Sequence, residues 1–104
     1  MGRKSYKLRF LPLFEHDLND AVDYIQYHLK NPGAAERLVD AVHGAILKRL
    51  SNPESFEPYY SAKDRLHPYY RIYVKNYIVF YVVIDDVMEV RRLVYHKRMF
   101  SAYI

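Results

Sequence analysis

The sequence contains no cysteine and only three glycines in 104 residues. Without cysteine the chain can form neither a disulfide framework nor a thiolate metal site, and this composition fits a reducing cytoplasm. Gly2, Gly33 and Gly44 stand far apart, so there is no glycine-rich loop that could cradle a phosphate group. The five serines occur in no nucleophile-elbow motif. Nucleophilic catalysis by serine or cysteine is therefore not supported.

The five histidines also lack the spacing of metal ligands. His16 and His28 fall on one predicted helix, but too many turns apart to share an ion. We therefore expect no metal site and no cofactor. No apolar run approaches the roughly 18 residues that a membrane span requires, and the first ten residues lack the apolar region of a signal peptide. These absences predict a cytoplasmic protein with no membrane partner.

Hydrophobic residues make up 51% of the chain and charged residues 27%, which is typical of a folded protein. The length predicts a single domain over residues 1–104. The formal net charge is +4, and basic residues are in excess at both ends of the chain whereas acidic residues are in excess in the middle. If the ends share one surface, that surface would attract nucleic acid or an acidic protein.

The first half of the chain predicts one strand and two helices. Residues 5–11 alternate apolar and basic side chains, as a half-buried strand does. Pro12 is expected to open a helix, and Asn31 with Pro32 to cap and begin a second one. Both helices carry apolar residues at helical spacing: Phe14, Leu18, Ala21, Val22, Ile25 and Leu29 in the first, and Ala35, Leu38, Val42, Ala45, Ile46 and Leu50 in the second. The short connection predicts an antiparallel helix hairpin.

The second half predicts a long loop and three strands. Residues 52–67 show no period, and the strand-like runs that follow are residues 69–74, 77–84 and 88–96. The two intervening breaks are short enough for hairpins. The middle run has no charge, so we expect it to be central in the sheet and covered on both faces. The predicted fold is α+β, β-α-α-β-β-β, with the antiparallel helix hairpin packed on one face of a mostly antiparallel sheet.

The stretch "RRLVYHKRM", residues 91–99, combines basic and aromatic side chains. Arginine and lysine can neutralise phosphates, and tyrosines such as Tyr73, Tyr77, Tyr81 and Tyr95 can stack on bases. The alternative is structural, because strands favour aromatic residues and edge strands carry basic side chains that block aggregation. Arg91 and Arg92 are adjacent on a strand, so they should face opposite ways. The pattern predicts an acidic helical layer behind a basic sheet.

The chain resembles the RelE/ParE superfamily, the toxins of bacterial type II toxin–antitoxin modules. The resemblance covers Tyr6 to about Met99 and is carried by four stretches in order: "DLNDAVDYI", "NPGAAERLVDAVHGAILKRLSNP", "YRIYVKNYIVFYVV" and "VRRLVYHKR". The Asn-Pro start of the second helix and its leucine-rich end at Asn-Pro are more similar to the ParE side. The resemblance implies a protein that inhibits growth, with a cognate antitoxin as its partner in a hetero-oligomer.

Two activities divide that superfamily. RelE-like toxins are mRNA endoribonucleases that cut messenger on the ribosome, and ParE-like toxins bind DNA gyrase without being enzymes. The first hypothesis for this chain is ribosome-dependent mRNA cleavage, the alternative is gyrase inhibition, and a third is a decayed toxin that retains only antitoxin binding. Whether the chain is an enzyme therefore stays open. The targets implied are the ribosome with mRNA or DNA gyrase.

The resemblance also suggests site residues for the nuclease hypothesis. Family nucleases often show Tyr-Arg-x-x-Tyr on the central strand; here Tyr77 and Tyr81 match, but Ile78 stands at the arginine position. Arg71, one strand earlier, is a possible substitute. The expected catalytic residues are Arg71, Tyr95, His96 and Arg98, with proton transfer by Tyr95 or His96 and phosphate binding by the arginines. The expected nucleic-acid-binding residues are Lys63, Arg65, Arg91, Arg92 and Lys97.

Overall fold

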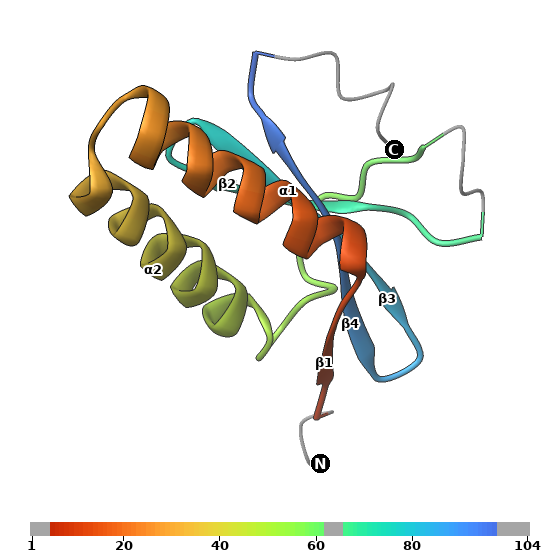
Figure 1. Cartoon of the computed structure of the whole chain (residues 1–104). Helices are drawn as coiled ribbons and strands as arrows, with labels where there is room; N and C mark the ends of the chain where they lie inside the picture. Colours follow the sequence, from red (N-terminus) through yellow and green to blue (C-terminus); the bar gives the residue numbers. More distant parts are fainter. Residues whose placement is uncertain (1–4, 62–65, 98–104) are drawn as a thin grey trace.

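The computed structural model describes residues 5–61 and 66–97. Two helices lie in front of a single sheet (Figure 1). The elements in chain order are β1 (Lys7–Phe10), α1 (Pro12–Asp23), η1 (Tyr24–His28), α2 (Pro32–Arg49), β2 (Tyr70–Val74), β3 (Tyr77–Ile84) and β4 (Val87–Tyr95). This order confirms the predicted α+β fold. Within the described residues no helix combines the length and apolar character that crossing a bilayer would require.

The sheet has the strand order β1-β4-β3-β2 and is mostly antiparallel. Two hairpins join β2 to β3 and β3 to β4, and β1 pairs with β4 in parallel. Lys75 and Asp85 take positive φ angles of 53° and 57° at the two hairpin turns. The uncharged strand β3 lies between β2 and β4, as predicted. The register of β3 with β4 shifts between Phe80 and Tyr81, and this irregularity falls opposite the two adjacent arginines of β4.

Local sequence signals set the helix boundaries. Pro12 and Pro32 begin α1 and α2, and the Asn31 side chain accepts a hydrogen bond from the Ala34 N–H at 3.1 Å, which satisfies one free amide of the first turn. The predicted α1 helix does not continue unchanged to Leu29. Its last turn is the π-helix η1, in which the Leu29 N–H donates to the Tyr24 carbonyl. The wider turn leaves Leu29 57% exposed, so its predicted place in the buried stripe is wrong.

Each face of the sheet has its own apolar cluster. The helix hairpin covers one face, where buried residues of α1 and α2 such as Phe14, Leu38 and Val42 pack against the strands. On the opposite face a second cluster is buried: Tyr69, Ile78, Phe80, Val82 and Val94, with Tyr59 from the preceding loop packed on it. The centre of that outer face is therefore an apolar core, a finding that limits what the sheet can present to a partner.

Candidate functional site

The positive charge of Arg91 on β4 is neutralised by a carboxylate of the same chain. Its Nε donates to the Glu89 carboxylate at 2.9 Å, and the same carboxylate accepts hydrogen bonds from Arg9 of β1. Glu89 is only 6% exposed. Burial opposes its ionisation, but the hydrogen bonds and positive charges of Arg9 and Arg91 outweigh that effect and hold the pKa of Glu89 below its ordinary value. Arg91 also donates to the Tyr69 hydroxyl at 3.1 Å.

Arg92 is held by helix α1. Its Nε and Nη2 donate to the Asp17 carboxylate at 2.7 and 2.9 Å. The same carboxylate accepts the backbone N–H of Leu93 at 3.0 Å. The Asp17 and Arg92 side chains are 12% and 19% exposed, so this is a largely desolvated pair. A charge on the sheet and a charge on the helix layer thus neutralise each other.

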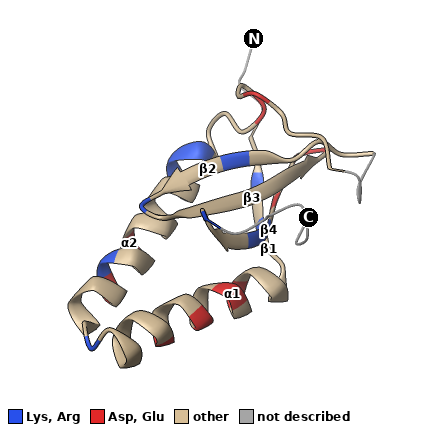
Figure 2. Ribbon diagram, turned by 90° about the horizontal axis from the view of Figure 1, so that it is seen from above, with Lys and Arg blue, Asp and Glu red and all other residues tan. Residues whose placement is uncertain are grey.

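Arg71 of β2 lies on the outer face, but it too has a carboxylate nearby. Its Nη2 is 3.7 Å from Glu57, and its guanidinium lies 5.2 Å from the centre of the Tyr59 ring. Figure 2 shows acidic residues along α1 and basic residues on β2 and β4. The sequence-based expectation of an open basic sheet is nevertheless wrong for Arg91 and Arg92, because largely buried carboxylates of the same chain bind them. Among the described carboxylates, Arg71 has only the exposed Glu57 near it. Whether Arg71, Arg91 and Arg92 contact nucleic acid stays a prediction.

Tyr95 and His96 do not converge on one site. Tyr95 packs edge-on against Tyr77 and lies on the helix side of the sheet. His96 follows it and contacts the ring of Tyr73 on β2, and Tyr73 pairs with Ile78 of the outer cluster. Adjacent residues point to opposite faces at the end of a strand. His96 therefore shares the outer face with Arg71, whereas Tyr95 does not.

The positions that match the family nuclease pattern are largely buried. Tyr81 is 0% exposed under the helices, and Tyr77 is partly buried on the same side. Ile78 is also 0% exposed, in the outer apolar cluster. A cation at position 78 would thus lie in a hydrophobic core, which would penalise its charge heavily. An apolar side chain such as isoleucine suits this buried position.

Several predicted site residues lie outside the described residues: Lys63, Arg65 and Arg98. Lys97 is described and is exposed. The residue before it, His96, donates its backbone N–H to the Asn76 carbonyl at 2.8 Å. Residues 5–61 and 66–97 contain as many acidic as basic side chains. The formal charge of +4 comes wholly from the remaining positions: Arg3, Lys4, Lys63, Arg65 and Arg98 against Asp64.

Arg49 organises a polar cluster that the sequence did not reveal. From the end of α2 it donates to the Tyr81 hydroxyl at 2.9 Å and to the Arg71 carbonyl at 3.2 Å. The Tyr81 hydroxyl in turn donates to the Pro53 carbonyl at 2.7 Å. Burial raises the pKa of Tyr81, although the Arg49 contact acts in the opposite direction. This cluster joins the end of α2 and the loop after it to the sheet.

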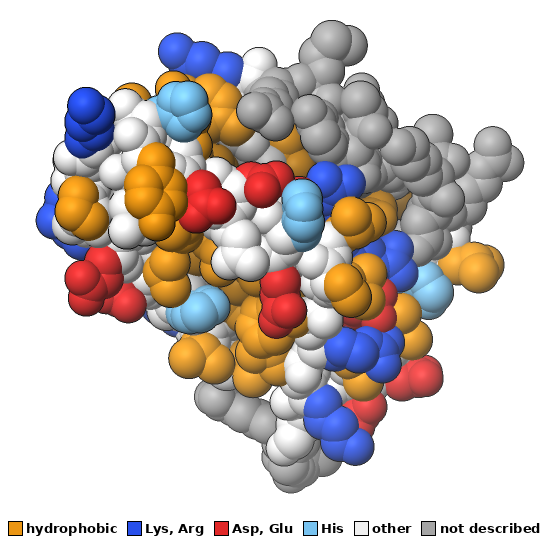
Figure 3. Space-filling view, viewed as in Figure 1, with side chains coloured by type: hydrophobic (Ala, Val, Ile, Leu, Met, Phe, Trp, Pro, Cys, Tyr) orange, Lys and Arg blue, Asp and Glu red, His pale blue; other side chains and the backbone are white. Residues whose placement is uncertain are grey.

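A groove of about 850 Å³ opens between the helix hairpin and the end of the sheet. Apolar side chains of both layers line it, among them Tyr24, Ile25, Leu38, Leu93 and Tyr95. Tyr24 of η1, which lines it, is 53% exposed, and Tyr27 of the same segment is 66% exposed. In Figure 3 hydrophobic side chains reach the surface at the hairpin end, at the left of the view. Sequence periodicity could not reveal the groove, because the π-helix that turns these tyrosines outward has no clear sequence signature.

Two cations of this groove have no acidic partner among the described residues. Arg37 of α2 and Lys75 of the β2–β3 turn both line the groove, and both are exposed. Asp20, on the opposite wall, is 3.3 Å from His16. Across residues 5–61 and 66–97 no three acidic or histidine side chains gather closely enough to hold a metal ion. The groove is thus suited to an apolar and acidic protein segment.

Comparisons with known proteins identify what the chain is similar to. The model of the family described as ParE toxin of type II toxin-antitoxin system, parDE, matches residues 8–100. A solved structure described as the chromosomal ParDE TA system from P. aeruginosa superposes with a TM-score of 0.68 at 13% identity, and the match covers 88% of this chain and 97% of that one. At this identity the structural match supports the fold alone. No curated protein sequence matches the chain.

Proposed function

The chain belongs to the ParE toxin family of type II toxin–antitoxin systems, and from that premise we propose that it arrests growth by binding DNA gyrase and is not itself an enzyme. Its partner in the resting state is an antitoxin, with which it forms a hetero-oligomer. The proposed site of action is the cytoplasm, where the gyrase target is found. This proposal prefers gyrase as the target, whereas the first hypothesis from the sequence was mRNA cleavage on the ribosome.

The observation that carries this proposal is the state of the outer sheet face. A nuclease needs uncompensated cations around the scissile phosphate and a proton-transfer group beside them. Among the described residues, Ile78 and Phe80 fill the centre of that face, Arg91 is bound to the buried Glu89, and Arg71 lies 3.7 Å from Glu57. Such a face lacks the uncompensated cations that phosphate chemistry needs, and this favours the non-enzymatic activity.

A supercoiling assay with purified gyrase and relaxed plasmid tests the proposal. Increasing toxin should block supercoiling and accumulate cleaved DNA complexes, and antitoxin added first should prevent both effects. Induction in cells should raise DNA-damage signalling before translation falls. Supercoiling that proceeds normally with toxin in large excess would remove gyrase as the target. Absence of growth arrest on induction would instead indicate a decayed toxin that retains only antitoxin binding.

One observation keeps mRNA cleavage as the second candidate. His96 lies edge-on against Tyr73, which is 60% exposed, at the end of the outer face that also holds Arg71. A histidine and an exposed tyrosine next to Lys97 could contact RNA. The test is incubation of toxin with translating ribosomes, followed by mapping of messenger ends. Wild-type cleavage that disappears in His96→Ala would favour this candidate, and intact messenger would exclude it.

A further inference from the structure

Among the described residues, two sets of cations differ in their ion pairing. Arg9, Arg91 and Arg92 lie on the strands and are bound to carboxylates of the same chain. Arg37 and Lys75 are exposed, line the groove, and have no such partner within residues 5–61 and 66–97. Uncompensated charge at the rim of an apolar groove can attract an oppositely charged partner without breaking an internal ion pair.

The groove also has the composition of a protein-binding surface. Its floor is apolar, with Leu38 and Leu93 buried beneath it, and Tyr24 remains 53% exposed on its wall. Tyrosine and arginine are the residue types that most often dominate binding energy at interfaces. Tyr24 lies at the start of η1 and stacks on His28 at 5.3 Å between ring centres. Segments of π-helix occur frequently at functional positions.

We propose that this groove is the gyrase-binding surface of the toxin, and that it receives a segment of gyrase that carries carboxylates beside apolar side chains. The inference rests on the proposed gyrase function. In this arrangement the apolar side chains of the gyrase segment lie over Leu38 and Leu93, while its carboxylates approach Arg37 and Lys75. Charge complementarity is the reason for an acidic segment, because the unpaired cations Arg37 and Lys75 outnumber Asp20, the exposed acid that also lines the groove. Antitoxin bound at the same groove would exclude gyrase sterically.

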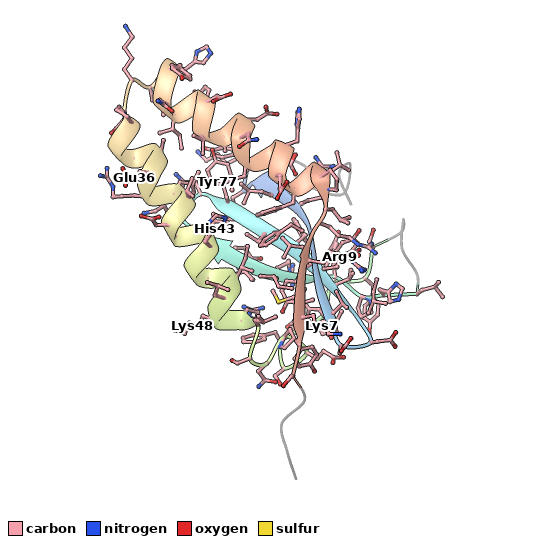
Figure 4. The ribbon with its side chains drawn as sticks, turned by 60° about the horizontal axis from the view of Figure 1, so that its bottom comes forward. Lys7, Arg9, Glu36, His43, Lys48 and Tyr77 are labelled. Carbon is pink, nitrogen blue, oxygen red and sulfur yellow. The ribbon has the colours of Figure 1, made fainter. Side chains whose placement is uncertain are left out.

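The decisive variant is the double charge reversal Arg37→Glu with Lys75→Glu. Both residues are exposed and form no ion pair within residues 5–61 and 66–97, so the fold should survive. The matched control is Lys48→Glu, which also reverses an exposed cation of α2. Figure 4 shows Lys48 at the end of that helix remote from Glu36 and Tyr77. Circular dichroism melts of all three proteins would verify folding before any binding is measured.

Binding of each protein to the gyrase holoenzyme is then measured by surface plasmon resonance, alongside supercoiling inhibition. The double variant should bind gyrase at least about tenfold more weakly than wild type, and with a smaller dependence on salt, whereas Lys48→Glu should match wild type. Equal binding by all three proteins would overturn the inference and leave the proposed function intact. Loss of antitoxin binding alone, with gyrase binding unchanged, would also overturn it. If wild type fails to bind gyrase, the proposed function itself fails.

Discussion

Replacing Asp17 with alanine removes the carboxylate that joins helix α1 to strand β4. The Asp17 side chain accepts three hydrogen bonds, two from the Arg92 guanidinium and one from the Leu93 N–H. Loss of one partner from a buried pair costs about 3–5 kcal/mol because the other charge remains desolvated. At 12% and 19% exposure the pair is partly hydrated, so we expect a loss of about 2–3 kcal/mol in the free energy of unfolding.

Urea denaturation followed by circular dichroism measures this change, and thermal melts should show a fall in Tm of about 10 °C or more. Asp20→Ala is the matched control, because Asp20 is an exposed acid of the same helix whose contact with His16 should be worth under about 0.5 kcal/mol. The double variant Asp17→Ala with Arg92→Met should recover part of the loss, since no unpaired charge is left behind. An unfolding free energy for Asp17→Ala within about 0.5 kcal/mol of wild type would refute the reasoning.

Three further predictions follow from other contacts. The pKa of Glu89 in the folded protein lies below its ordinary value of 4.5, so ionised Glu89 stabilises the fold above pH 4.5. This stabilisation is lost as the pH falls through the folded pKa. The difference in unfolding free energy between wild type and Glu89→Gln, measured by urea denaturation, should therefore become smaller below pH 4.5. Arg49→Ala should lower the unfolding free energy by about 1–3 kcal/mol, because the Tyr81 hydroxyl and the Arg71 carbonyl each lose a donor; no change in denaturation midpoint would contradict this. Ile78→Arg, which restores the family nuclease arginine, should destabilise the fold by more than about 3 kcal/mol and create no ribonuclease activity, and a stable, RNA-cleaving variant would show that position 78 is not a core site.

The fold was predictable from the sequence because its signals are local. Pro12, Asn31 and Pro32 mark the helix starts, and the two hairpin breaks flank an uncharged central strand. The predicted apolar stripe of the first helix was wrong only at Leu29, where the π-helix η1 replaces the regular α-helix. A π-turn depends on how the helix end packs against its neighbours, which residue spacing does not encode.

The candidate site was less predictable because charges pair over long distances in the sequence. Counting residues places Arg91 and Arg92 in a basic run, but their carboxylate partners come from α1 and from the register between β1 and β4. Composition cannot distinguish a cation that is paired in this way from one that is exposed at a rim. Arg37 and Lys75 appeared unremarkable in the sequence for the same reason.

The helices also control where this sheet could be extended by another chain. Arg49 occupies the carbonyl of Arg71 on the terminal strand β2, and Asp17 occupies the N–H of Leu93 where β4 continues past β1. Both positions are thereby closed to strand addition, a common route to aggregation for unprotected edges. Among the described strands, β1 and β2 are the two edges of the sheet, and the Arg49 contact occupies one backbone carbonyl of β2. A peptide that joins the sheet by backbone pairing would therefore meet this obstacle at β2 but not at β1, beside Lys7 and Arg9.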